Sequence, residues 1–268
     1  IGRTIASEAE IYDLVVFGAD SRCKDLQLVG NEFHNGSMGI HIKSTATKYN
    51  QSLIIKNNTF HDVYHRAIWI QYTDSLVVEG NTFTGNTSTS SNSIRVFAKF
   101  CNYFNINANH MQSKATGIFI LNCNGATTQP RVISNNTIKI TGTSSYSKGI
   151  SFKTSSNVNC YYNTVQMTNT NAASVAFYNE GNTGGDLMNN IFHHASAGLA
   201  IQFTSATNST VSDYNLFYSN GSNVARTGTT DYSTLAAWTT ATNQDSNSVS
   251  SDVTFNGGSD FHTADLDI

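Results

Sequence analysis

The sequence is short of charge and of proline. Charged residues make up 12% of its 268 positions, the net charge is −3 at pH 7, and Pro130 is its single proline. With so little charge of either sign, we expect neither a nucleic-acid partner nor an anionic membrane surface. No apolar run reaches the ~20 residues of a transmembrane helix, so membrane insertion is not expected. The rarity of proline favours a chain whose backbone N–H groups are engaged in β ladders.

A secretory signal peptide is not visible either, and the sequence begins at Ile1 rather than at methionine. We therefore expect a processed protein or an excised piece, acting as a monomer or as part of a longer chain.

What the sequence does contain is a repeat built around asparagine. Asn57-Asn58-Thr59-Phe60 returns, for example, as Asn135-Asn136-Thr137-Ile138. The spacings between the anchoring asparagines are 27, 23, 28, 27, 27, 27 and 25 residues, and these anchors are Asn31, Asn58, Asn81, Asn109, Asn136, Asn163, Asn190 and Asn215. A period of roughly 20 to 50 residues indicates a solenoid or an array.

Each repeat carries three extended segments. In the second repeat these are the alternating run Leu53-Ile54-Ile55, the segment that contains Phe60, and Ala67-Ile68-Trp69-Ile70. Period-two alternation of β-branched residues predicts strands. Three short strands per repeat, stacked in register, predict an all-β fold, a parallel β-helix of about eight coils with stacked asparagines at one bend.

The four cysteines, Cys23, Cys101, Cys123 and Cys160, include no C-x-x-C pair, so a zinc site is not expected. Cys160 lies three residues before Asn163, where other repeats carry leucine, isoleucine or valine. We therefore expect Cys160 to be a small buried hydrophobe. The other three are free or paired.

The pattern Leu-x-Ile-x-Asn-Asn-x-Phe, followed by Gly-Ile-x-Ile, covers residues 11 to 217. It resembles the right-handed parallel β-helix repeats of the pectin-lyase-like superfamily. The resemblance implies a secreted or cell-surface bacterial protein. It does not imply one activity, because the fold hosts lyases, hydrolases, epimerases, tailspikes and adhesins.

Two parts of the chain are distinguished by this pattern. Residues 1–217 are expected to form the β-helix, and residues 218–268 a cap or lid packed on it. Asp231-Tyr232-Ser233 can begin a short helix over 234–241, with Leu235 and Trp238 on one side.

The third segments predict a binding strip on one sheet. Their outward residues are placed in two columns, the first His41, Trp69, Arg95, Phe119, Ser151, Ala176 and Ala200, the second Lys43, Gln71, Phe97, Leu121, Lys153, Tyr178 and Gln202. Sugar C–H faces stack on aromatic rings, and cations pair with uronate carboxylates. We therefore expect a polysaccharide partner, held by His41, Trp69, Gln71, Arg95, Phe97, Phe119 and Tyr178. The alternative is that a neighbouring loop covers these rings.

An enzymatic alternative rests on Lys43-Ser44, which resembles the Lys-Ser of alginate- and chondroitinase-type β-helix lyases. In this reading a polysaccharide lyase or epimerase would use Lys43, with His65 or Arg66 in support. Gln71 stands where those lyases carry arginine, and Gly39 and His41 where they carry acidic calcium ligands. The paired carboxylates of glycoside hydrolysis are not visible.

We therefore lean towards a non-catalytic module, with a structural stalk as the third possibility. No cofactor is expected from the residues. The alternative is a calcium ion bound by loop carbonyls.

Overall fold

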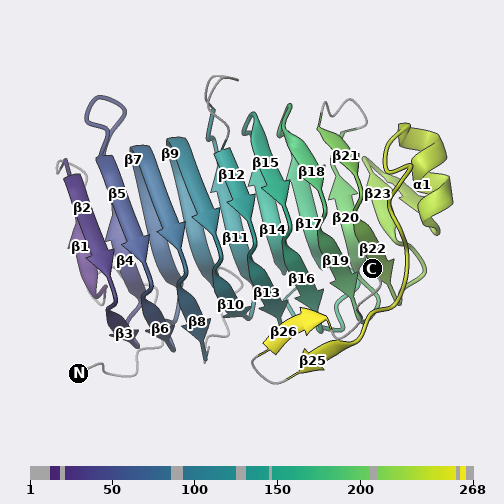
Figure 1. Ribbon diagram of the computed structural model, residues 1–268, viewed down its shortest axis with the longest axis horizontal. Helices are drawn as coiled ribbons and strands as arrows, with labels where there is room; N and C mark the ends of the chain where they lie inside the picture. The colour runs from purple at the N-terminus through teal and green to yellow at the C-terminus, as the bar shows by residue number, and fades with distance from the viewer. Residues whose placement is uncertain are drawn as a thin grey trace.

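The computed structural model describes residues 13–18, 22–85, 93–124, 131–144, 147–205, 210–257 and 260–263. The chain winds as a solenoid in which like strands of successive coils lie side by side (Figure 1). The expectation of an all-β parallel solenoid is confirmed.

Three faces surround the core. Face 1 holds β1 (Val15–Phe17), β4 (Met38–Ile42), β11 (Thr116–Leu121), β14 (Lys148–Lys153), β17 (Val175–Glu180), β20 (Leu199–Phe203) and β23 (Ala225–Thr227). Face 2 holds β2 (Lys24–Val29), β5 (Gln51–Lys56), β12 (Arg131–Ser134), β15 (Val158–Tyr161), β18 (Asp186–Met188) and β21 (Val211–Asp213). Two long strands, β7 (Arg66–Glu79) and β9 (Ile94–Asn107), run from face 1 into face 2 without interruption and join them into one sheet.

Face 3 is a separate parallel sheet. Its strands, in chain order, are β3 (Glu32–His34), β6 (Thr59–His61), β8 (Thr82–Thr84), β10 (His110–Ser113), β13 (Thr137–Ile140), β16 (Thr164–Met167), β19 (Ile191–His194) and β22 (Leu216–Ser219). Phe60 pairs in register with Phe33 and with Phe83, and their rings stack at centroid distances of 4.8 Å on both sides. Like residues therefore form a continuous apolar column through the core.

The core column of face 2 shows the same stacking. Ile133 pairs with Cys160, and Cys160 pairs with Leu187. Cys160 is fully buried, as expected, and burial raises the pKa of its thiol. All four cysteines are buried and none forms a disulfide.

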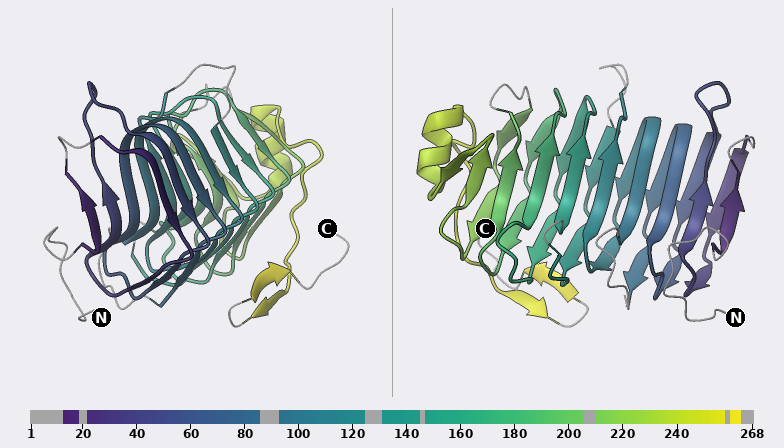
Figure 2. Two further views of the ribbon diagram at one scale, coloured as in Figure 1. Left: turned by 60° about the vertical axis from the view of Figure 1, so that its left-hand side comes forward. Right: turned by 180° about the vertical axis from the view of Figure 1, so that it is seen from behind.

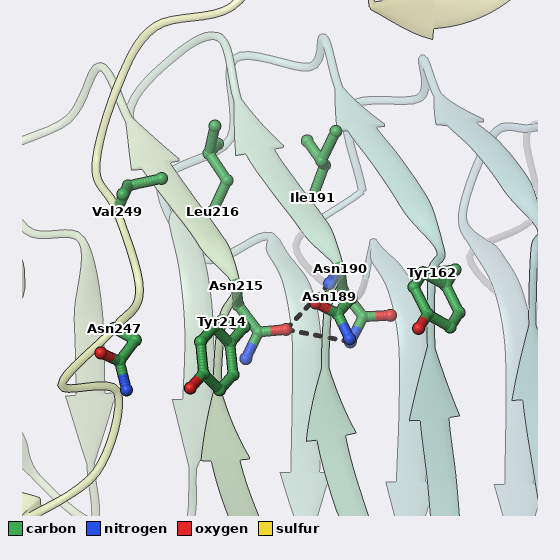
Figure 3. A pocket seen from close by; sticks show the side chains of 9 residues that line it. All are labelled: Tyr162, Asn189, Asn190, Ile191, Tyr214, Asn215, Leu216, Asn247 and Val249. Carbon is green, nitrogen blue, oxygen red and sulfur yellow. Dashed lines mark hydrogen bonds between the residues drawn. The ribbon is translucent and has the colours of Figure 1, made fainter. Parts of the chain in front are cut away.

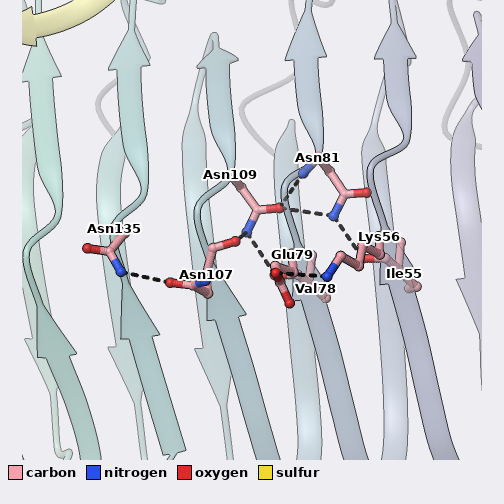
Figure 4. A network of polar contacts seen from close by, with 8 residues as sticks. All are labelled: Ile55, Lys56, Val78, Glu79, Asn81, Asn107, Asn109 and Asn135. Carbon is pink, nitrogen blue, oxygen red and sulfur yellow. Dashed lines mark hydrogen bonds and ion pairs between the residues drawn. The ribbon is translucent and has the colours of Figure 1, made fainter. Parts of the chain in front are cut away.

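The bend between faces 2 and 3 carries the asparagine ladder (Figure 4). The Nδ2 atom of Asn81 donates to Oδ1 of Asn109 at 2.9 Å. In the next step of the ladder, Nδ2 of Asn109 donates to Oδ1 of Asn136 at 2.9 Å. Asn109 also donates to the Val78 carbonyl, one coil back, at 2.9 Å. The predicted amide-to-amide ladder is confirmed.

The C-terminal segment leaves the solenoid pattern. Strand β24 (Thr230–Tyr232) pairs antiparallel with β23, and helix α1 (Leu235–Thr242) follows at the end of the solenoid. Trp238 on α1 is fully buried and lies 5.4 Å from the ring of Phe203. The hairpin of β25 (Phe255–Gly257) and β26 (Asp260–Thr263) then lies beside face 3 (Figure 2). The helix fits a cap, whereas the division between residues 217 and 218 stays a prediction.

Candidate functional site

The outward column of face 1 is a stack of aromatic rings. In register along the solenoid it reads His41, Trp69, Phe97, Phe119, Ser151, Tyr178, Gln202 and Arg226. His41 and Trp69 have ring centroids 4.2 Å apart, and Phe97 and Phe119 have theirs 5.1 Å apart. Phe97 and Tyr178 therefore belong to the same column as Trp69, not to the second column in which the sequence pattern placed them.

The predicted outward position of Arg95 is wrong. Arg66 pairs with Ile94, and Ile68 pairs with Val96, so Arg95 lies opposite Ala67. Its side chain is 1% exposed.

The guanidinium of Arg95 is bound by backbone oxygens. Its nitrogens donate to the carbonyls of Gln112 at 2.6 Å, Val63 at 3.3 Å and Gly85 at 2.7 Å. Burial lowers its pKa to about 10, and Asp62 counteracts part of that shift. Arg95 therefore holds the bends together and presents no charge on the surface.

Much of the ring stack is covered. His41 is fully buried and Phe97 is 5% exposed, whereas Trp69, Phe119 and Tyr178 are half-buried. His41 Nδ1 lies 2.6 Å from Oδ2 of Asp13, whose side chain is also buried. The spacing of 28 residues, one coil, was the available sequence signal for this pair, but sequence reasoning missed it.

Cationic side chains lie over the rings. The Nζ atom of Lys43 is 5.1 Å from the Trp69 centroid, and the guanidinium carbon of Arg66 is 4.3 Å from it. Further along, Nζ of Lys148 lies 4.2 Å from the centroid of Tyr178. Burial lowers the pKa of Lys148, and Glu180 opposes that shift. A cation over a ring face is attracted by the ring quadrupole.

Face 1 carries a concentration of basic side chains, although the net charge of the whole chain is weakly negative. Its cations are Lys43, Arg66, Lys99, Lys148, Lys153 and Arg226. Lys153 is paired with Glu180 at 2.6 Å, and Arg226 is paired with Asp231. Gln71 pairs in register with Lys99 and adds an amide to the same face. We call Lys43, Arg66, Lys99, Lys148 and Lys153, together with the ring stack of the same face, the basic face.

The residues of the enzymatic alternative are partly brought together. Lys43 and Arg66 both lie near the Trp69 ring centroid, at 5.1 and 4.3 Å, but His65 is only 5% exposed. Its backbone N–H donates to the Ser37 carbonyl at 2.8 Å, and its carbonyl accepts from Ile94 at 2.8 Å. The catalytic roles of these three residues stay predictions.

A serine–histidine contact elsewhere was missed by the sequence reading. Oγ of Ser174 lies 2.7 Å from Nε2 of His194, and the Ser196 N–H donates to Nδ1 of His194 at 3.2 Å. Because Nδ1 accepts, Nε2 carries the proton of the neutral ring and donates to Ser174. Such a histidine cannot take the serine proton, so the contact is structural.

The fold and the ring-lined face define a right-handed parallel β-helix protein of the pectin-lyase-like type. Within that class, residues 5–145, more than half of the chain, match the family described as "Periplasmic copper-binding protein (NosD)". The chain belongs to this family. No curated protein and no solved structure matches the chain. Across the described ranges, no helix is long and apolar enough to cross a membrane.

Among the described residues, no cluster of His, Cys, Asp and Glu side chains fits a resident copper ion. Protein copper sites draw on several converging imidazole, thiolate or thioether groups. Within the described part of the chain, no group of three or more His, Cys, Asp or Glu side chains could hold a metal. The four thiols are buried, and both ring nitrogens of His194 are engaged by Ser174 and Ser196. The expectation of calcium gains no support from the same residues.

Proposed function

We propose that this protein is a non-catalytic module that binds an acidic polysaccharide along the basic face, in the bacterial envelope or outside the cell. The observation that carries the proposal is the set of cations on face 1. Lys43 and Arg66 lie over Trp69 in the ring stack that runs from His41 to Phe119, and Lys148 lies over Tyr178 further along. Carboxylates of a uronate polymer would pair with the cations, and sugar C–H faces would rest on the exposed ring edges. The periplasmic description of the family supports the location.

The repeat supplies the geometry for a long ligand. Neighbouring coils are ~4.8 Å apart, and the register of Lys99 continues through Leu121 to Lys153, so these two cations lie two coils apart on one line. An extended polymer can therefore engage several coils at once, and its affinity accumulates over weak contacts. Ser151, between Phe119 and Tyr178, leaves room between two rings of the column.

The first test is size-exclusion chromatography of polygalacturonate, alginate and neutral dextran after long incubation with the protein, with and without calcium. We expect the acidic chains to remain intact and to carry the protein with them. Arg66→Ala and Trp69→Ala should each weaken binding about tenfold, because each removes a charge or its platform. Lys56→Ala, which removes a cation of face 2 paired with Glu79 at 3.0 Å, is the matched control.

The same experiment addresses the lyase alternative, which the position of both Lys43 and Arg66 at the Trp69 ring favours. Shortened acidic chains with unsaturated uronate ends, lost in Lys43→Ala, would replace the binding module by an enzyme. Acidic chains that elute intact and without the protein would contradict both.

A further inference from the structure

A second surface lies at the bend between faces 2 and 3, towards the C-terminal end of the solenoid. A groove of about 440 Å³ is open there, with the rings of Tyr162 and Tyr214 on either side of Asn189 (Figure 3). Asn247 and Val249 line its far end. None of the side chains that line the groove is charged.

The two rings are unusually open to solvent. Tyr162 is 61% exposed and Tyr214 is 57% exposed, the two most exposed large hydrophobic side chains in the described part of the chain. Neither of them stacks on another ring there. Packing within the protein therefore does not account for two aromatic side chains at this bend.

Their backbone adds a cost. Tyr162 has φ 55° and Tyr214 has φ 57°, in the left-handed region that L-residues with large side chains disfavour. At the same position other coils carry Asn57, Gly80 and Asn189, which adopt that conformation more readily. Each tyrosine therefore carries a conformational cost that an asparagine at the same position largely avoids.

Aromatic residues with positive φ also occur at the bend between faces 1 and 2. There, stacking of the rings offsets the strain of the backbone. Tyr72 and Phe100 have positive φ and stack on each other with centroids 4.5 Å apart. At the groove no such contact exists between Tyr162 and Tyr214, because the coil of Asn189 separates them. A strained backbone with an unused ring is a reason to look for an external partner.

The spacing indicates the partner. Two coils separate the rings by roughly 10 Å, close to the length of an extended disaccharide unit. We propose that the groove binds an uncharged glycan, with Tyr162 and Tyr214 stacking on alternate sugars and the Asn189 amide bonding hydroxyls of the sugar between them. Aromatic platforms flanked by amides suit sugars, which present C–H faces and hydroxyl edges.

The charge beside the groove and the shape of the groove further restrict the class of glycan that can bind. The Asp213 carboxylate is held beside the groove by the backbone N–H and the side-chain amide of Asn247, at 2.7 and 2.8 Å. This negative charge disfavours uronates and sulfated sugars, unlike the basic face. Val249 takes the place of a further strand, because its N–H donates to the Asn215 carbonyl and its carbonyl accepts from Phe217. The groove is thus closed at the C-terminal end, and the glycan extends towards Tyr162.

The test is isothermal titration calorimetry of the whole chain with cellohexaose, laminarihexaose and maltohexaose. We expect at least one hexaose to bind, Tyr162→Asn or Tyr214→Asn to weaken it at least tenfold, and the double variant to abolish it. Because asparagine suits the left-handed bend, these variants should melt at the same temperature as the parent or higher. Val211→Thr, which alters an exposed apolar side chain of β21 outside the groove, should bind normally.

Three outcomes would overturn the inference: no hexaose binds to the parent protein, the double variant binds as well as the parent, or the variants melt at a lower temperature. Arg66→Ala separates the two surfaces. This variant should leave the affinity for the hexaose unchanged while it weakens the binding of polygalacturonate. Either proposal can therefore be refuted without the other.

Discussion

Asn136 shows how one side chain joins three coils. Its Oδ1 accepts from both the backbone N–H and Nδ2 of Asn109, at 3.0 and 2.9 Å. Its Nδ2 donates to Oδ1 of Asn163 and to the Ile106 carbonyl, each at 2.9 Å. The residue is fully buried, so water cannot replace any of these partners. Bends of this solenoid are therefore held by side-chain amides as much as by backbone ladders.

Replacing this residue tests that role. Asn136→Ala should lower the free energy of unfolding by about 1 to 3 kcal/mol, because the donors of Asn109 and the Ile106 carbonyl lose their partners. Urea unfolding followed by circular dichroism measures the change. The matched control is Asn135→Gly next to it, an exposed position with φ 54° that glycine tolerates. Equal stability of Asn136→Ala and the parent would contradict the role given to the ladder.

At the scale of elements, the bend after β19 depends on a neutral imidazole. His194 ends β19, contacts Ser174 just before β17, and accepts a hydrogen bond from the N–H of Ser196 in the bend. Burial, reinforced by the neighbouring His193, lowers the pKa of His194 to about 4. Below pH 6.5 the unfolded chain binds a proton that the folded chain does not bind until about pH 4.

Stability should therefore fall as the pH drops from 6.5 to 4, with a contribution from His194 of up to about 3 kcal/mol. Above pH 6.5 His194 is neutral in both the folded and the unfolded chain, so it causes no loss of stability there. His194→Gln, which keeps a polar side chain but does not titrate, should flatten the profile across this window even if its stability at pH 7 is lower. Parallel profiles for the two proteins, measured by urea unfolding at each pH, would show that another group causes the loss.

The elements also show where sequence reasoning stops. The asparagine repeat and the Phe33–Phe60 column predicted the coils and the core, because their alternation is regular. The third segment of each repeat does not follow this regular alternation of inward and outward residues. In Gly39-Ile40 both residues face the interior, since a Cβ on Gly39 would lie 2.8 Å from the ring of Phe60 and Ile40 is buried. With two inward positions in succession, the pattern Ile94-Arg95-Val96 fits two registers.

The site was predictable only in outline. The aromatic and basic character of face 1 follows from residue types such as Trp69 and Lys43, whereas the burial of Arg95 does not. Burial of a charged arginine is unfavourable unless its donors are paired. Arg95 is buried because three carbonyls from separate segments accept hydrogen bonds from its guanidinium. The exposure of Tyr162 and Tyr214 likewise depends on what the adjacent coils leave uncovered.

For the whole molecule, the C-terminal end is closed by Trp238. Its ring packs beside Phe203 and Tyr232, and its Nε1 donates to Oδ2 of Asp245 at 2.7 Å. In a solenoid each coil contacts mainly its neighbours, so stability is close to a sum over coils and their interfaces. Damage to one end should therefore remain near that end.

Trp238→Ala should cost about 3 to 5 kcal/mol in the C-terminal coils and leave the others largely intact. Hydrogen exchange measured by mass spectrometry should show lost protection in β20, β22 and β23, with β6, β8 and β10 unchanged. A uniform loss of protection along the chain would instead indicate that the solenoid unfolds as one unit. Leu235→Ala on the same helix, at a side chain only partly buried, should cause a smaller change of the same kind.

The amides of the ladder all point one way. From Asn31 to Asn190, each Nδ2 donates one hydrogen bond to Oδ1 of the asparagine in the next coil. The last member, Asn215, meets the Asp245 carboxylate at 3.4 Å. Aligned bonds polarise one another, so the ladder is an electrically directional rod that ends on a negative charge. The two ends of the solenoid are thus chemically unequal.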